Sequence, residues 1–235
     1  MPCQYDQLCA ILKALIDGLV HSVQALWDEN LTTENWVFLL VDAKNAFNDI
    51  NRVRMMWIFR QLWLSGARFV FNFYRHWSSL VLWNGDGTAS FIHSKEGVTH
   101  RDPLAMIVYG IGILPLINNL KREIPDVTQP CYADNSGALG TFVILETCFD
   151  LLTCQGLGRG YYTKPSKSVP IVHLENLEAG KLFGACHGFK MFTGARYLGV
   201  YIRDDESKRD WLRECTLTCE KNISIISKNA GINCH

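Results

Sequence analysis

The sequence lacks the features that mark secreted, membrane-spanning and zinc-binding proteins. Its first residues, Met1–Gln4, carry no charged side chain, and Lys13, Asp17 and His21 interrupt the first apolar stretch. Neither a signal peptide nor a membrane span is therefore expected. The nine cysteines show no pair of Cys-X-X-Cys spacings, which disfavours a zinc site and a disulfide framework. We expect a soluble, intracellular protein with reduced thiols, either cytoplasmic or nuclear.

An overall surplus of either charge is also missing. Twenty-three basic residues balance 23 acidic ones, so the whole molecule has no general attraction for nucleic acid. Two local stretches differ, because basic residues outnumber acidic ones there: Lys44, Arg52, Arg54, Arg60, Arg68 and Arg75 against Asp49 alone, and then Arg159, Lys164 and Lys167. These stretches predict phosphate contacts. The alternative is a solvated helix face whose anionic partners lie elsewhere.

Hydrophobic patterning predicts an α+β fold in which helices cover one side of an antiparallel sheet and leave its other side free. Trp36–Val41 is an unbroken apolar run, which favours a strand buried on both faces and ending at Asp42. Asn84–Gly87 lies between two short apolar runs and predicts a hairpin. Asp102 and Pro103 favour the start of a long helix. The other expected elements are helices over 9–27, 48–64, 69–76, 142–155 and from about 205, and strands over 127–132, from 137, over 168–173 and over 197–202.

Three shorter segments interrupt this pattern. Gly66 predicts a break between two helices. Asp134–Gly137 consists of residue types that accept tight-turn backbone angles, so we expect a hairpin whose tip presents Asp134. Glu175–Lys190 has no clear hydrophobic period, and no regular element is assigned to it.

Two aspartates stand at positions where they can act together. Asp42 ends the buried strand and Asp134 lies at the predicted hairpin tip, so adjacent central strands would bring them together although 92 positions separate them. Paired carboxylates can hold two magnesium ions about 3.5–4 Å apart, which activate an attacking hydroxyl and stabilise a leaving oxygen. The alternative is that Asp42 caps the following helix and that Asp134 only makes a turn.

Five segments carry a more specific signal because of their order. The first begins Val-Asp-Ala-Lys-Asn-Ala-Phe-Asn, the second Gly-Val-Thr-His-Arg-Asp-Pro-Leu, and the third is Tyr-Ala-Asp-Asn. The five are Val41–Arg52, Gly97–Met106, Tyr132–Asn135, Pro165–Ser168 and Arg196–Gly199. In this order they resemble the palm motifs of reverse transcriptases of non-LTR retrotransposons. An unrelated metal-dependent phosphotransferase would require all five matches to be accidental.

The resemblance implies a domain organisation. It predicts partial fingers with an N-terminal helix over 1–35, a reverse transcriptase palm over 36–203, and a C-terminal helix with a truncated thumb connection over 204–235. Because 41 residues precede Asp42 and 36 follow Gly199, we expect partial fingers and little or no thumb. No endonuclease or RNase H segment is expected.

The resemblance also implies roles for individual residues. Asp42, Asp134 and Asn135 are the expected catalytic residues, with Asp42 and Asp134 as ligands of two Mg²⁺ or Mn²⁺ ions. The expected substrate-binding residues are Ala43 through its carbonyl, Phe47 beside the sugar, His100, Arg101, and Lys167 near the triphosphate. Tyr197, Leu198 and Gly199 are expected near the primer end. The alternatives are a core aromatic at Phe47, a solvated lysine at Lys167 and a plain edge strand at 197–199.

Two departures from the motifs bear on activity. Asn135 stands where the family has a second aspartate, which removes a negative charge and a metal ligand. His100-Arg101 stands where the family has Gln-Gly, so large side chains occupy a place of close backbone approach. We therefore expect a reverse transcriptase-like domain, with an RNA template, a DNA primer and deoxynucleotides as partners, whose activity is reduced or lost. The alternative is a non-catalytic remnant that binds nucleic acid or protein.

Overall fold

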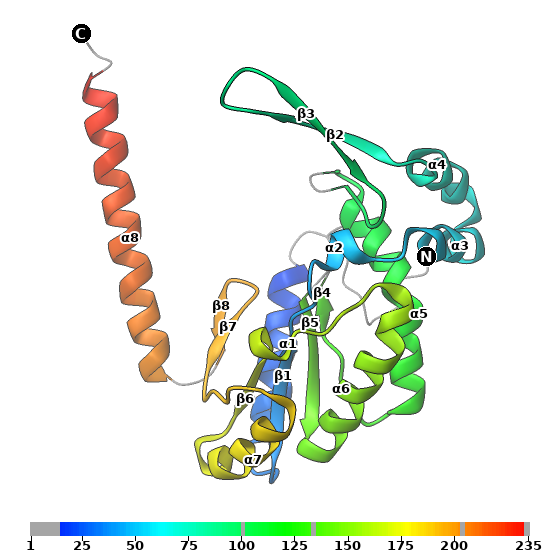
Figure 1. Cartoon of the computed structure of the whole chain (residues 1–235). Helices are drawn as coiled ribbons and strands as arrows, with labels where there is room; N and C mark the ends of the chain where they lie inside the picture. The colour runs from blue at the N-terminus through cyan, green and yellow to red at the C-terminus, as the bar shows by residue number, and fades with distance from the viewer. Residues whose placement is uncertain (1–14, 100–101, 133–134, 203–204, 233–235) are drawn as a thin grey trace.

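A four-stranded antiparallel sheet lies at the centre of the structure, a computed structural model that describes residues 15–99, 102–132, 135–202 and 205–232 (Figure 1). The strand order is β4-β5-β1-β6. Their bounds are Trp36–Val41 for β1, Cys131–Tyr132 for β4, Asn135–Thr141 for β5 and Val169–Val172 for β6. The bounds of β1 match the prediction, and β1 is central because it pairs with β5 on one side and with β6 on the other.

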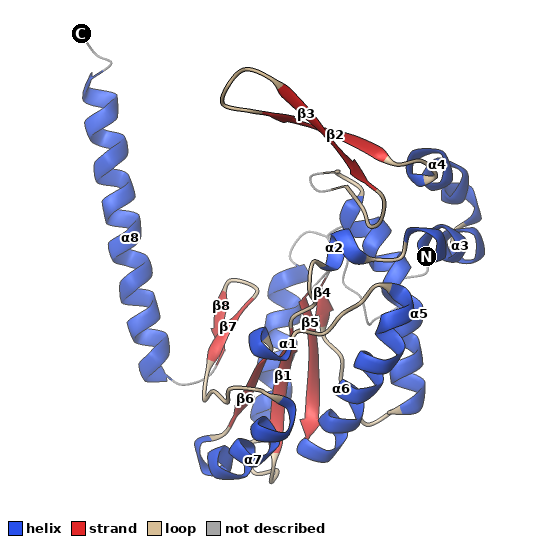
Figure 2. Cartoon of the chain, viewed as in Figure 1, coloured by secondary structure: helices blue, strands red, loops and turns tan. Residues whose placement is uncertain are grey.

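One face of the sheet packs against the helices α5 and α6, which Figure 2 shows beside the strands. Val37, Leu39 and Val41 alternate along β1 toward this face and are buried with apolar residues of both helices, as the two-residue period of a strand requires. The bounds are Ala105–Glu123 for α5, Phe142–Gly156 for α6 and Leu177–His187 for α7, which packs on the same cluster. The predicted α+β class is confirmed.

The opposite face of the sheet is covered, contrary to the prediction that it is free. Phe38 of β1 shares a buried cluster with apolar residues of α1 and of the β7–β8 hairpin. The elements are α1 at Leu15–Glu29, β7 at Ala195–Tyr197 and β8 at Val200–Ile202. The physical reason is that the apolar stripe of α1, which includes Val23 and Trp27, is itself removed from water by this contact. An opening remains where β1 ends.

Three helices and a hairpin follow β1 and form the upper part of Figure 1. Their bounds are Ala46–Asp49 for α2, Arg52–Leu62 for α3, Leu64–Tyr74 for α4, Ser78–Trp83 for β2 and Ala89–Ser94 for β3. The predicted hairpin is confirmed. The single helix predicted over 48–64 is divided, because Asn51 caps α3 with its side chain. The break expected at Gly66 is wrong: the chain turns at Trp63, whose ring covers Gly66 within α4.

Arg52, which belongs to the first basic stretch, has a buried side chain. It is 3% exposed, and its guanidinium donates hydrogen bonds to Gly97 O at 3.0 Å, Ser94 O at 3.0 Å and Glu96 O at 2.9 Å. Burial lowers the pKa of Arg52, and these acceptors satisfy its donors. Arg52 therefore ties the base of the β2–β3 hairpin to α3 and is not available to bind phosphate.

Later elements partly depart from the sequence expectations. The helix predicted over 142–155 and the strand over 168–173 are confirmed as α6 and β6. The segment over 197–202 is a hairpin and not one strand. Asn135–Gly137 belongs to β5 and not to a turn, and β4 is shorter than predicted. The unassigned segment over 175–190 contains α7. Helix α8 spans Asp205–Ile232, as the last prediction expected.

The long helix predicted after Asp102 is α5, which begins at Ala105. Asp102 still organises this start, because its carboxylate accepts the Leu104 N–H at 2.9 Å and the hydroxyl of Tyr74. Burial and this hydrogen bond raise the pKa of Tyr74. Leu104, just before the first residue of α5, is 36% exposed. Within the described ranges, no helix combines the length and apolar character needed to cross a membrane.

Candidate functional site

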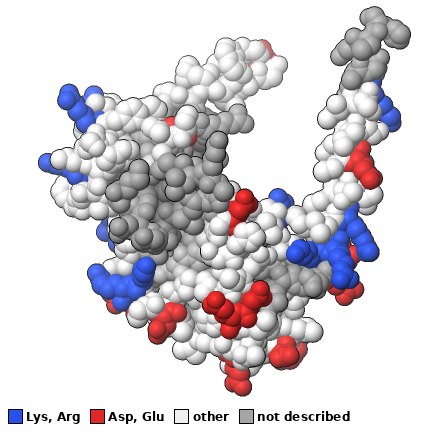
Figure 3. All heavy atoms as spheres, turned by 180° about the vertical axis from the view of Figure 1, so that it is seen from behind, with Lys and Arg blue, Asp and Glu red and all other residues white. Residues whose placement is uncertain are grey.

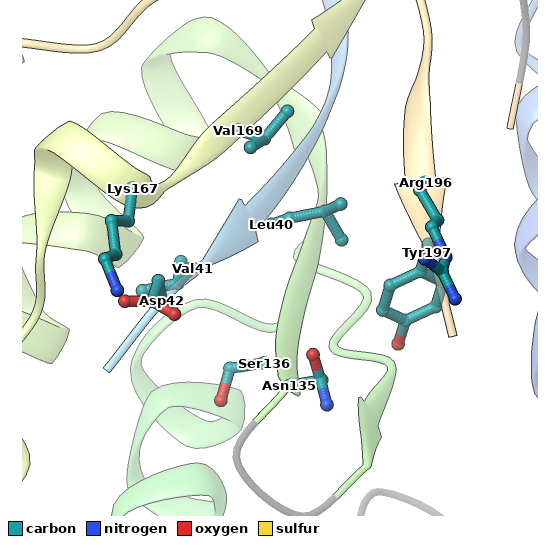
Figure 4. A pocket seen from close by; sticks show the side chains of 9 residues that line it. All are labelled: Leu40, Val41, Asp42, Asn135, Ser136, Lys167, Val169, Arg196 and Tyr197. Carbon is teal, nitrogen blue, oxygen red and sulfur yellow. The ribbon is translucent and has the colours of Figure 1, made fainter. Parts of the chain in front are cut away.

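A pocket of about 170 Å³ opens where β1 ends (Figure 4). Residues from four of the five motif-like segments line it together, and from the predicted set these are Asp42, Asn135, Lys167 and Tyr197. Figure 4 shows Asp42 and Lys167 pointing toward one another on one side and Tyr197 on the other. The remaining lining residues are Leu40, Val41, Ser136, Val169 and Arg196.

Strand register explains why segments so distant in sequence meet here. Val41 pairs with Ser136 across β1 and β5, so Asp42 lies beside Asn135. Asn135 in turn pairs with Tyr132 across β4 and β5. The expected tip of this hairpin, Asp134, lies outside the described residues, as do His100 and Arg101. The arrangement thus places one predicted carboxylate, Asp42, in the pocket.

The backbone of Asp42 is held from the side of β6. Its N–H donates to Ser168 Oγ at 3.1 Å, and its carbonyl accepts the Lys164 N–H at 2.8 Å. The Ser168 hydroxyl donates to Lys164 O at 3.0 Å. The buried side chain of Ser168 therefore connects the end of β1 to the turn at Lys164. Ser168 ends the fourth motif-like segment, but its sequence position alone gave no sign of this positioning role.

Tyr161 is buried and interacts with Asp42 and Ser136, two residues that line the pocket. Burial raises the pKa of its phenol, and the charge of Asp42 raises it further. The phenol therefore stays neutral at ordinary pH. The preceding residue, Gly160, has a φ of +74° and lies so close to the chain at Asp49 that a Cβ there would collide with the carbonyl of Asp49.

Phe47 lies on α2 and is not among the residues that line the pocket. Its ring is half-buried and packs against Tyr109 of α5 with ring centroids 4.8 Å apart. Its carbonyl accepts the Val98 N–H at 2.7 Å, which joins the first motif-like segment to the second. This packing agrees with the alternative that Phe47 is a core aromatic. The position of Phe47 near the sugar of a nucleotide stays a prediction.

The segment expected near a primer end is a tight hairpin. Tyr197 is 2% exposed, and its hydroxyl donates to Pro130 O at 3.2 Å. Leu198 and Gly199 form the two-residue turn between β7 and β8 with φ angles of +48° and +87°. The alternative of a plain edge strand is therefore wrong. Arg196, which sequence reasoning did not single out, also lines the pocket.

The donor set of the pocket suits a hard cation only in part. In the described residues it offers the Asp42 carboxylate, the amide oxygen of Asn135 and the hydroxyl of Ser136. The part of the chain that is described contains no group of three metal-binding side chains. Mg²⁺ needs only one or two carboxylates when waters and substrate phosphates fill its other positions. The described residues of the pocket therefore supply part of a ligand set that suits Mg²⁺.

No protein-family model and no curated protein matches this chain. Solved structures do match. Apo telomerase from Candida tropicalis aligns with a TM-score of 0.58 at 12% identity, over 84% of this chain and 36% of that one. The same enzyme truncated from its C-terminal domain gives 0.57 at 13%, over 84% and 39%. Telomerase from Candida albicans in complex with a TWJ fragment of telomeric RNA gives 0.56 at 11%, over 72% and 32%.

The chain has a reverse transcriptase-like fold. Telomerase is a polymerase related to reverse transcriptases, and at such low identity the match concerns the fold alone. The chain spans between 32% and 39% of the lengths of these telomerase chains. In this reverse transcriptase-like fold, the pocket at Asp42 is the place where four of the five motif-like segments converge.

Ser168→Ala should destabilise the protein by about 1–2 kcal/mol, because it leaves the Asp42 N–H without its acceptor. Ser166→Ala is the matched control, since Ser166 is exposed in the same turn, and should change stability by less than about 0.5 kcal/mol. Urea denaturation followed by circular dichroism measures both. Equal losses for the two variants would contradict the anchoring role of Ser168.

Proposed function

We propose that this chain is the palm of a reverse transcriptase-like polymerase of the non-LTR retrotransposon type, with template-directed DNA synthesis as its ancestral reaction. The observation that carries the proposal is the convergence of Asp42, Asn135, Lys167 and Tyr197 on one pocket. They come from four segments matching polymerase motifs in order, within a fold shared with telomerase. An accidental set of motifs has no physical reason to converge in this way.

The proposed roles follow from the chemistry of each group. Asp42, the carbonyl of Ala43 and Asp134 would hold one or two Mg²⁺ or Mn²⁺ ions. When bound, such ions activate a primer 3′-hydroxyl and offset the charge on the phosphates. Lys167 is exposed at the rim of the pocket, where its ammonium can bind the triphosphate of a deoxynucleotide.

The nucleic-acid partners are proposed from Arg196 on the opposite rim of the pocket and from the similar telomerase structures. Arg196 is exposed there beside the turn at Leu198 and Gly199, so its guanidinium can bind a phosphate of the primer. The structure of telomerase from Candida albicans contains a TWJ fragment of telomeric RNA. This supports RNA as a partner of the proposed polymerase, and the DNA primer is proposed from the resemblance of the motifs alone.

We propose that this copy is a decayed polymerase with weak or no activity. Asn135 supplies a neutral amide to the pocket, in the place where the motif has a carboxylate. A neutral oxygen attracts a divalent cation less than a charged one does. Separately, the motif comparison places His100 and Arg101 where Gln-Gly is usual, and these side chains would narrow the space for the incoming nucleotide.

Primer extension on an RNA template with Mg²⁺ or Mn²⁺ tests this proposal. The unaltered chain should extend the primer weakly or not at all, and Asn135→Asp should raise the rate by about tenfold or more because it restores a carboxylate. His100→Gln and Arg101→Gly, added to Asn135→Asp, should raise it further. Adding Asp42→Asn should abolish extension, whereas Asp126→Asn, an exposed residue that does not line the pocket, should leave it unchanged.

Two outcomes would overturn the proposal. Robust extension by the unaltered chain would refute the decay of this copy. No extension by the triple variant, provided that it is folded, would remove the support for a polymerase site.

A second candidate function is a non-catalytic nucleic-acid-binding domain, and the neutral Asn135 in the pocket favours it. It predicts RNA binding that weakens steeply as the salt concentration rises and that survives Asp42→Asn combined with Asp134→Asn. Fluorescence anisotropy with labelled RNA measures both properties. This candidate fails if binding is absent at low salt.

A further inference from the structure

Helix α8 extends away from the body as an arm (Figure 1). Its first turns are attached through Trp211, whose ring lies 6.0 Å from that of Tyr201 and 6.0 Å from the guanidinium of Arg196. Seen from behind in Figure 3, the rest of the helix stands clear of the body. A helix of this kind gains little stability from its own backbone, so a packing partner for it is expected.

An apolar stripe runs along this arm. Its members recur at steps of three and four residues: Leu212, Cys215, Cys219, Ile223 and Ile226. At about 100° per residue they all lie within about 40° of the direction of Cys219. Ile223 and Ile226 are each 66% exposed, and Leu212 is 47% exposed. These five side chains thus share one continuous face, while Leu217 and Ile225, which are also exposed, lie off it.

The spacing of the stripe is the same in both directions from Cys219. Leu212 lies seven positions before it and Ile226 seven after, while Cys215 and Ile223 each lie four positions away. When two copies of α8 lie antiparallel about a two-fold axis at Cys219, Leu212 of each copy faces Ile226 of the other. Cys215 likewise faces Ile223. A two-fold interface needs such self-complementarity.

We propose that α8 binds the α8 of a second copy of this chain in this antiparallel arrangement. The borders of the stripe support a protein partner, because Thr216 and Asn222 beside it are uncharged. Lys208, one turn before Leu212 on the same face, marks the end of the stripe. Arg213 and Glu220 lie farther from the stripe, both on the same flank of the helix. That side of the proposed pair therefore carries both positive and negative charges. The antiparallel arrangement also places the two bodies at opposite ends, since about 21 Å of helix separates residue 205 from the axis.

Cys219 makes the proposed axis measurable. Packed helix axes lie about 8–10 Å apart, and Cα atoms lie about 2.3 Å from their own axis. The two Cys219 Cα atoms would therefore be about 3.4–5.4 Å apart, a range that overlaps with the roughly 4.4–6.8 Å found in disulfides. In a parallel pair Cys215 would also face its own counterpart, but in the antiparallel pair it faces Ile223.

Sedimentation velocity of the full chain in reducing buffer tests the association. We expect a reversible dimer of twice 26.7 kDa at tens of micromolar protein. Ile223→Lys should weaken dimerisation at least tenfold. Leu217→Lys is the matched control, because Leu217 is 56% exposed on the opposite side of the helix, and it should dimerise like the unaltered chain. A monomer at these concentrations, or a dimer that Ile223→Lys leaves intact, would overturn the proposal.

Oxidation with diamide, which takes up the two hydrogen atoms lost by the thiols, tests the orientation. A covalent dimer should form in the unaltered chain and in Cys215→Ser, and it should be lost in Cys219→Ser. Cross-linking that persists in Cys219→Ser but is lost when Cys215→Ser is added would indicate a parallel pair and contradict the arrangement. Circular dichroism establishes that each variant retains its helices.

Discussion

The antiparallel pairing of β1 with β5 and β6 is the interaction on which the rest of the structure depends. It fixes the end of β1 beside Asn135 on one side and beside the turn that contains Lys167 on the other. A shift of one residue in this register would move Asp42 to the face covered by α5 and α6. The buried side chains of β1, which alternate toward both faces, make such a shift costly.

The elements that sequence predicted well are those whose signals are local. The apolar run that forms β1, the polar turn of the β2–β3 hairpin and the period of α6 depend on neighbouring residues only. Helix α7 was missed because Gly180 and Gly184 interrupt its pattern. In the structure, both glycines let the helix approach Met191 closely, a contact that no local pattern reveals.

The errors in the site have similar causes. The hairpin at Leu198 and Gly199 was missed because leucine is not a usual turn residue, although here it adopts a φ of +48°. The burial of Arg52 depends on carbonyls about 40 positions away, so charge counting could not distinguish it from a surface arginine. The motif matches, in contrast, identified four residues that the fold brings to one pocket. The covered face of the sheet was missed because it depends on where α1 docks.

The central proposal is that the end of β1 and the start of β5 together bind a divalent cation. Nuclear magnetic resonance of ¹⁵N-labelled protein during titration with Mn²⁺ tests it without requiring activity. The amide signals of Asp42, Asn135 and Ser136 should broaden first, and Asp42→Asn should remove this effect. Broadening centred on another part of the chain, or broadening at the same residues that is unchanged in Asp42→Asn, would show that the end of β1 does not bind the cation.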